Sequence, residues 1–258
     1  MTVPTRRRGT TSLVVLMLVA AGCSQGGGMR VDGWTAPSRT VFSYEETIIG
    51  RTAAGRAVSC RFLGDGPETV LILAGIHGSE PAGTPLVEAL HVHLRDNPRP
   101  VEGRTIVLLP AANPDGISNG TRTNAQGVDL NRNFPAGNFR PRKGNGGQPL
   151  SEPESQALHD LILGRRPRRI VSIHQPLSCV DYDGPAESLA RAMAAAGDLP
   201  VRKLGLQPGS LGSWAGETLG IPTITVELPA EASRLGQNEL WRRYGAMLLV
   251  AIDSEGAQ

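Results

Sequence analysis

The 258-residue sequence has little net charge and no long apolar segment, and each of these absences excludes a class of protein. A formal charge of +2 argues against a nucleic-acid-binding protein, because such proteins usually carry a marked excess of basic residues. No apolar run approaches the roughly 20 residues that a transmembrane helix needs. The hydrophobic fraction of 40% is too high for a disordered chain, and the length suits one large α/β domain or two small ones.

The N-terminus resembles an export signal. Arg6, Arg7 and Arg8 form a positive region, and the apolar segment 13–22 (LVVLMLVAAG) has about the length of a signal-peptide core. Small residues stand directly before Cys23, which resembles a bacterial lipoprotein signal in which this cysteine is acylated. An ordinary cleaved signal peptide with an incidental cysteine is the alternative.

We therefore expect residues 1–22 to be a signal peptide, residues 23–35 a lipidated terminus with a flexible tether, and residues 36–258 one folded domain. Without residues 1–22 the formal charge falls from +2 to −1, because three arginines and no acidic residue are removed. The lipid would hold the domain at the periplasmic face of a bacterial membrane without spanning it. Ser24 after the cysteine favours the outer membrane.

Apolar, β-branched runs alternate with helical patterns in the predicted domain. Continuous apolar runs are typical of strands covered on both faces, and they occupy residues 69–74, 105–109, 169–173 and 223–228. Helical patterns occupy residues 81–95, 151–163 and 238–252. Ser151 and Glu154 fit a capping box at the start of the second helix, and the Gly- and Pro-rich residues 136–149 predict a long polar loop. The alternation predicts a three-layer α/β/α sandwich with a mixed, largely parallel central sheet.

A histidine and a glutamate follow the first predicted strand. His77 and Glu80 lie in the segment GIHGSEP, where a spacing of three residues can direct both side chains to one point. His174 stands at the end of another apolar strand, and α/β sheets place their sites at strand ends. Two imidazoles and a carboxylate with an open fourth position form a catalytic zinc set. The remaining histidines, which we expect to pack or to lie on the surface, are His91, His93 and His159.

Several motifs in order along the chain make the pattern specific. They read GIHGSEP, NPDG at 113–116, GVDLNRNFP at 127–135, SEPESQAL, IHQPLSCV, PGSLGSW at 208–214 and ITVELP at 224–229. Together they resemble the zinc carboxypeptidase family over most of the predicted domain. Within that family the resemblance is to enzymes that hydrolyse the amide between γ-D-glutamate and diaminopimelate in peptidoglycan-derived peptides.

The resemblance implies one Zn²⁺ ion per chain, bound by His77, Glu80 and His174, with Asp129 orienting His77. It also implies that Glu227 is the general base on the zinc-activated water and then the proton donor to the leaving amine. A glutamate in an apolar strand is costly to bury without a purpose, which independently favours a functional role.

The resemblance further assigns the substrate contacts. Arg122 would polarise the scissile carbonyl, and Asn131 with Arg132 would hold the substrate's terminal carboxylate, which suits the bidentate geometry of arginine. The residues expected to line the specificity pocket are Ser210, Leu211, Gly212 and Trp214. In one departure from the family pattern, residues 203–210 lack the mobile tyrosine that other members place over the substrate.

Several functions fit this sequence. A metallocarboxypeptidase of broader C-terminal specificity and a deacylase of N-acyl amino acids would both use the same ligands and carboxylate contacts. A non-catalytic lipoprotein that binds murein peptides is the alternative from another class, although binding alone needs no general base at Glu227. Cys60 and Cys179 are the cysteines left after Cys23, and either a disulfide or two separate thiols fits the sequence.

Overall fold

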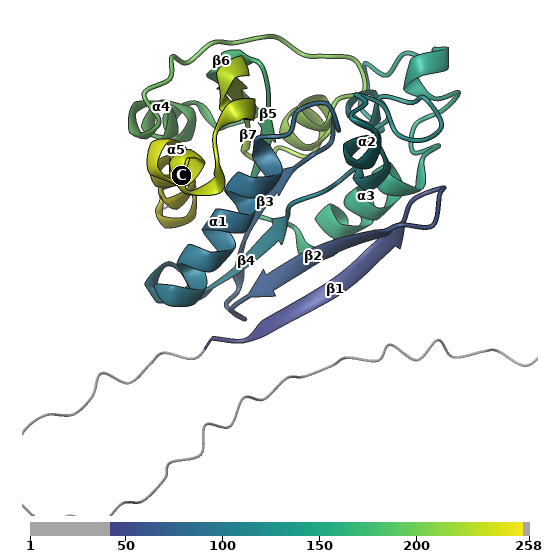
Figure 1. Cartoon of the computed structure of the whole chain (residues 1–258). Helices are drawn as coiled ribbons and strands as arrows, with labels where there is room; N and C mark the ends of the chain where they lie inside the picture. The colour runs from purple at the N-terminus through teal and green to yellow at the C-terminus, as the bar shows by residue number, and fades with distance from the viewer. Residues whose placement is uncertain (1–41, 255–258) are drawn as a thin grey trace, which may run out of the picture. The chain divides into compact units, whose positions relative to one another are not determined.

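A seven-stranded mixed sheet forms the middle layer of residues 42–254, the part of the chain that the computed structural model describes (Figure 1). Its strand order is β1-β2-β4-β3-β5-β7-β6. The parallel strands in the middle are β4 (Arg104–Leu109), β3 (Glu68–Ala74), β5 (Arg169–His174) and β7 (Thr223–Pro229). The antiparallel strands towards the edges are β1 (Tyr44–Arg51), β2 (Ala57–Leu63) and β6 (Leu177–Asp183). The predicted signal peptide, tether and Cys23 lie outside the described residues.

Helices cover both faces of this sheet. One face carries α1 (Gly83–Asp96), α4 (Glu187–Ala196) and α5 (Gln237–Asp253), and the other carries α3 (Pro153–Arg165). The short elements are α2 (Pro114–Asn119), η1 (Arg99–Val101), η2 (Leu130–Arg132), η3 (Lys143–Asn145), η4 (Gly212–Thr218) and η5 (Ala230–Arg234). Among the described residues, no helix has both the length and the apolar character to cross a membrane.

The side chains of β3 and β4 alternate between two apolar cores. On β3, Val70 and Ile72 pack with α1 and α5, whereas Leu71 and Leu73 pack on the side of α3. Because both faces of these strands are covered, their sequences read as continuous apolar runs. All four predicted strands are the parallel ones, and the predicted α/β sandwich with a mixed, largely parallel sheet is confirmed.

The antiparallel strands were not predicted, because their burial is uneven. Most of β1 is exposed, including Tyr44 and Ile48, so it carries no continuous apolar run. In β6 apolar residues alternate with Asp181 and Asp183. These strands therefore lack the signal that identified the others.

The predicted capping box at the start of α3 is wrong. The helix begins after Glu152, which makes no side-chain cap hydrogen bond. The hydroxyl of Ser151 donates to Oε1 of Glu152 at 2.8 Å and accepts from Nδ2 of Asn133 at 2.9 Å, so it is engaged away from the helix. Glu154 is buried, and Nδ2 of Asn124 lies 3.3 Å from its Oε2.

The loop predicted at residues 136–149 is present, with one short turn, η3, inside it. Nδ2 of Asn133 donates to the carbonyl oxygens of Asn145 and Gln148, at 2.8 and 3.2 Å. The backbone N–H of Asp129 donates to the carbonyl of Gly144 at 2.7 Å. The loop is therefore tied to the GVDLNRNFP segment.

Cys60 and Cys179 remain separate thiols. Both are buried, and they lie in β2 and β6, which have four other strands between them in the sheet. This geometry excludes the disulfide that the sequence left open.

Candidate active site

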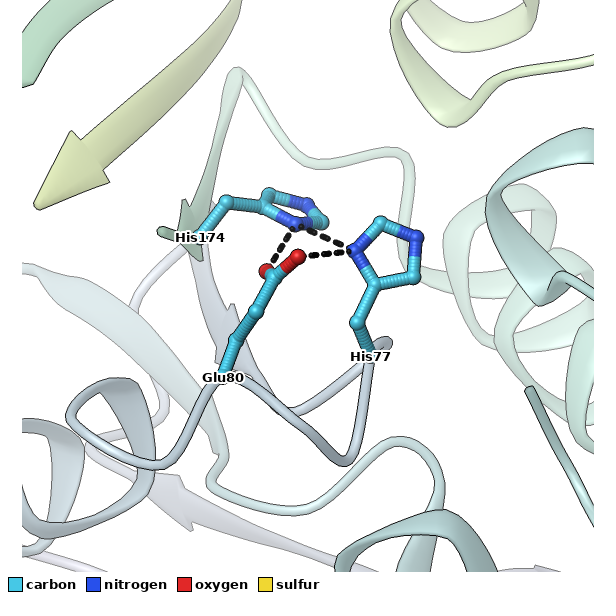
Figure 2. A group of neighbouring side chains, drawn as sticks. All are labelled: His77, Glu80 and His174. Carbon is cyan, nitrogen blue, oxygen red and sulfur yellow. Dashed lines mark hydrogen bonds and ion pairs between the residues drawn. The ribbon is translucent and has the colours of Figure 1, made fainter. Parts of the chain in front are cut away.

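His77, Glu80 and His174 meet where β3 and β5 end (Figure 2). The strands are parallel neighbours, so the loop after β3 and the last residue of β5 reach the same edge of the sheet. Nδ1 of His77 lies 2.7 Å from Oε1 of Glu80, and Nδ1 of His174 lies 2.9 Å from Oε2. The two Nδ1 atoms are 3.1 Å apart.

These residues fit a zinc ion. One ligand atom from each lies within 4.8 Å of the others, and two imidazole nitrogens with one carboxylate form a donor set that Zn²⁺ prefers. Burial alone would raise the pKa of Glu80, but its hydrogen bonds with His174 and His77 outweigh burial and lower the pKa to about 2. The carboxylate is therefore charged at neutral pH.

The second nitrogen of each histidine ring, Nε2, also has a hydrogen-bonding partner. Nε2 of His77 lies 3.0 Å from Oδ1 of Asp129, and Nε2 of His174 lies 2.9 Å from Oγ of Ser172. Such contacts fix the ring orientation and the tautomer in which Nδ1 would be free to bind a metal ion. The structure thus places Asp129 where the sequence expected it, and it adds Ser172, which no motif indicated.

The NPDG segment fixes the backbone that carries His77 and Glu80. Asn113 caps α2 by accepting the N–H of Gly116 at 2.8 Å, and its Nδ2 donates to the carbonyl of Ile76 at 3.1 Å. Gly78 packs directly on α2, since a Cβ atom there would lie 1.9 Å from the carbonyl carbon of Gly116. Two motifs far apart in sequence thereby form one rigid support.

Arg122, Asn131 and Arg132 lie around the same site. Nε of Arg122 donates to Oδ2 of Asp129 at 3.0 Å, and its Nη1 lies 3.3 Å from Oε1 of Glu80. Oδ1 of Asn131 accepts the N–H of Leu211 at 2.9 Å. Nη1 of Arg132 donates to the carbonyl of Asn131 at 2.6 Å, so the two residues of the predicted carboxylate site are directly linked.

Glu227 faces the metal ligands from β7. It is in register with His174 on β5, and Oε2 accepts the N–H of Leu177 at 3.3 Å. Burial raises the pKa of Glu227. A carboxylate with a raised pKa is a better proton acceptor at neutral pH, as a general base requires.

A cavity of about 420 Å³ opens over these groups. It contains all the predicted metal, catalytic and carboxylate-binding residues, together with Ser210, Leu211 and Gly212. The expectation for Trp214 is wrong, because this side chain is buried and stacks on Phe134 with ring centroids 5.6 Å apart. Polar residues that the sequence did not single out also line the cavity, namely Ser172, Asp181, Asp183, Thr223 and Thr225.

Residues 203–207, which lack a tyrosine, contribute Leu204, Gly205 and Gln207 to the cavity wall. Oε1 of Gln207 accepts from Nη2 of Arg132 at 3.4 Å. The wall beside the carboxylate site is thus built from aliphatic and amide side chains.

The other histidines pack against aromatic rings, as predicted. The ring pairs are His91 with Tyr44, His93 with Trp241 and His159 with Trp214, with centroids 5.5, 4.7 and 4.9 Å apart.

Comparisons with known proteins identify relatives of this chain. The zinc carboxypeptidase family model matches residues 41–182, more than half of the chain. Murein peptide amidase A of Escherichia coli K12 is 39% identical over 184 residues, which are 64% of this chain and 73% of that protein. The crystal structure of murein-tripeptide amidase MpaA from Escherichia coli O157 has a TM-score of 0.65 at 30% identity, covering 87% of this chain and 98% of that one.

A more distant structure shares the fold. Carboxypeptidase A from Helicoverpa armigera has a TM-score of 0.68 at 19% identity, covering 82% of this chain and 69% of that one. The likeness therefore extends over most of the sheet and its helices.

Replacing Gly78 with alanine should weaken zinc binding. The added methyl group would collide with the Gly116 backbone, so the loop that carries His77 and Glu80 must shift. We expect the zinc affinity to fall on the order of 10- to 100-fold, measured by competition with a chromogenic chelator. Gly137→Ala is the matched control, because nothing lies within 4 Å of the added atom. Equal affinities in the two variants would contradict the proposed support by α2.

Proposed function

The chain belongs to the zinc carboxypeptidase family, and we propose that it is a zinc-dependent amidase that hydrolyses the γ-D-glutamyl-diaminopimelate bond of peptidoglycan peptides. The observation that carries this proposal is the single cavity that holds the His77, Glu80 and His174 ligands together with a buried glutamate and two arginines. The likeness to murein peptide amidase A over 73% of that protein supports the choice of substrate.

The ligand residues and Glu227 divide the chemistry. Zinc bound by His77, Glu80 and His174 would supply a Lewis acid that lowers the pKa of a water molecule towards about 7. Glu227, on the neighbouring strand, accepts a proton from the attacking water. The same carboxyl group then returns a proton to the nitrogen of the leaving amine, so its protonation state is restored after each turnover.

The two arginines act on opposite sides of the scissile amide bond, one on the carbonyl of the glutamyl residue and the other on the carboxylate of the leaving residue. Arg122 is half exposed beside Glu80, and its guanidinium can donate to the scissile carbonyl as negative charge develops on the oxygen. Arg132 and the amide of Asn131 bind the carboxylate of diaminopimelate through charge-assisted hydrogen bonds. These contacts fix the amide bond relative to the metal ligands.

A glutamine at position 227 should abolish hydrolysis without removing the metal. The amide keeps the shape of the side chain but cannot accept the proton, so kcat should fall roughly 10²- to 10⁴-fold. The assay measures free diaminopimelate released from L-alanyl-γ-D-glutamyl-diaminopimelate, and metal analysis measures zinc. Treatment with a chelator should stop the parent enzyme, and added Zn²⁺ should restore it.

Glu102→Gln, an exposed change after η1, is the control and should keep full activity. Binding of the tripeptide without hydrolysis by the zinc-loaded parent would support a binding protein instead. Faster hydrolysis of ordinary C-terminal L-peptides than of γ-D-glutamyl peptides would support a general carboxypeptidase.

Replacing Arg132 with glutamine should weaken substrate binding more than catalysis. The variant loses a charge-assisted contact to the substrate carboxylate, so KM should rise on the order of 10- to 100-fold while kcat changes little. Steady-state kinetics on the tripeptide measures both constants. Arg99→Gln, at an exposed position of η1, should leave them unchanged. An unchanged KM in the Arg132 variant would remove this residue from the carboxylate site.

We also propose that the protein is a lipoprotein anchored through Cys23 at the periplasmic face of the membrane, with Ser24 favouring the outer membrane. The support is the basic and apolar N-terminal sequence that ends in small residues before this cysteine. The anchor would place the domain near peptidoglycan, its substrate.

Replacing Cys23 with alanine should release the protein from the membrane. In a bacterial host, the parent should enter the detergent phase of a phase-separation assay, and the variant should stay in the aqueous phase. Mass spectrometry of the N-terminal peptide should show a diacylglyceryl group on Cys23 of the parent. A parent that is exported, cleaved and unmodified would contradict the lipid anchor and leave the enzymatic proposal intact.

A further inference from the structure

Three neighbouring strands carry a polar strip beneath the cavity. Ser172 on β5 is in register with Thr225 on β7, and Thr225 is in register with Asp181 on β6. One row further along, Thr223 is in register with Asp183. All five residues line the cavity.

The polar strip lies on the same face of the sheet as His174 and Glu227. His174 and Glu227 are in register, and side chains two residues apart on a strand share a face. The row of Asp181 therefore lies about 7 Å along the sheet from Glu227, and the row of Asp183 about 13 Å. An extended side chain of the lysine type spans the first of these distances. The residues on the opposite face of the same strands are apolar core residues, namely Val171, Ile173, Val180, Ile224 and Val226.

The two aspartates are buried with little positive charge beside them. Each has only 6% of its surface exposed. Oδ1 of Asp181 accepts the N–H of Leu204 at 3.1 Å, and the ion pair found for Asp183 within residues 42–254 is a long one, 3.5 Å to Nζ of half-exposed Lys203. Burial raises the pKa of Asp181, and it raises that of Asp183 to about 6. Burying a charged carboxylate costs free energy of desolvation unless a cation binds to it.

The backbone over Asp183 is shaped around this side chain. A Cβ atom on Gly212 would lie 1.9 Å from Oδ2 of Asp183, and one on Gly216 would lie 2.5 Å from its Cβ. Glycine at both positions lets η4 approach the carboxylate while the cavity stays open beside it.

The cavity is therefore electrically divided. Arg122 lies beside Glu80 and Arg132 beside Asn131, where the proposed function puts the scissile carbonyl and the terminal carboxylate. Asp181 and Asp183 lie further along the sheet from Glu227. A residue with a terminal carboxylate and a cationic group at the end of its side chain matches both sides.

We propose that Asp181 and Asp183 determine specificity by binding an ammonium group at the end of the leaving residue's side chain, with the hydroxyls of Ser172, Thr223 and Thr225 around it. This inference rests on the proposed function, since the side chain of diaminopimelate ends in a carbon that carries an ammonium group and a carboxylate, and the aspartates would bind the ammonium group. It adds a selection step that the metal ligands and the arginines do not provide.

The test compares leaving residues with and without the ammonium group. Zinc-loaded parent enzyme and the variants Asp181→Asn and Asp183→Asn are assayed on γ-D-glutamyl-diaminopimelate, γ-D-glutamyl-lysine and γ-D-glutamyl-norleucine. The parent should prefer the two substrates whose side chains carry an ammonium group. Each variant should lose on the order of 10- to 100-fold in kcat/KM for them and little for norleucine. Asp65→Asn, in the exposed loop before β3 at the far end of that strand, is the control and should change none of the three.

A second measurement does not depend on turnover. Calorimetry should show that the parent binds free diaminopimelate and lysine more tightly than norleucine, and that the asparagine variants lose this difference. Norleucine peptide hydrolysis at the parental rate shows that a variant is folded and holds zinc.

Three results would overturn the inference: no preference of the parent for cationic residues, unchanged selectivity in both variants, or an equal loss on all substrates. A parent that cleaves no γ-D-glutamyl peptide would overturn the proposed function instead. Product binding by calorimetry would still decide the ammonium site in that case.

Discussion

The site depends on holding three polar groups together at a buried point. The Nδ1 atoms of His77 and His174 lie 3.1 Å apart with the charged carboxylate of Glu80 against both, an arrangement that needs a proton or a cation between them. Much of the nearby structure serves this requirement. Asp129 and Ser172 hold the outer ring nitrogens, and α2 fixes the loop after β3. The protein thus holds the three ligand side chains together in advance, and this support should strengthen zinc binding.

The sequence revealed the parallel strands and left the antiparallel ones undetected, for a physical reason. Strands β3 and β4 are covered by apolar layers on both sides and read as apolar runs. Strands β5 and β7 turn polar residues to the cavity on one face, and they were predicted from the β-branched apolar residues of the other face. Strand β6 is covered by the core on one face only, where Val180 packs, while Asp181 and Asp183 face the cavity. Strands β5 and β7 line the same cavity but carry more β-branched apolar residues, whereas β6 has aspartate at two alternate positions and resembles a surface segment.

Site residues were predictable where they belong to a motif. His77, Glu80, His174 and Glu227 were named from short motifs, and the structure brings them into one cavity. Position along a motif does not give side-chain direction, however. The segment PGSLGSW places Leu211 at the cavity but turns Trp214 into the core against Phe134. Ser172 was missed because its importance comes from sharing a strand face with His174, which only the fold reveals.

The antiparallel direction of β6 gives the pocket its depth. The chain turns after His174, re-enters the sheet at Leu177 beside Glu227, and then runs away from the metal ligands along β7 to Asp183. The side chain of the leaving residue therefore extends alongside β6, away from the metal ligands. It would pass Asp181 first and Asp183 after it. A further parallel strand would instead need a long crossover to enter the sheet. The tight return thus lets one strand pass from the reaction centre to the groups that read the far end of the substrate.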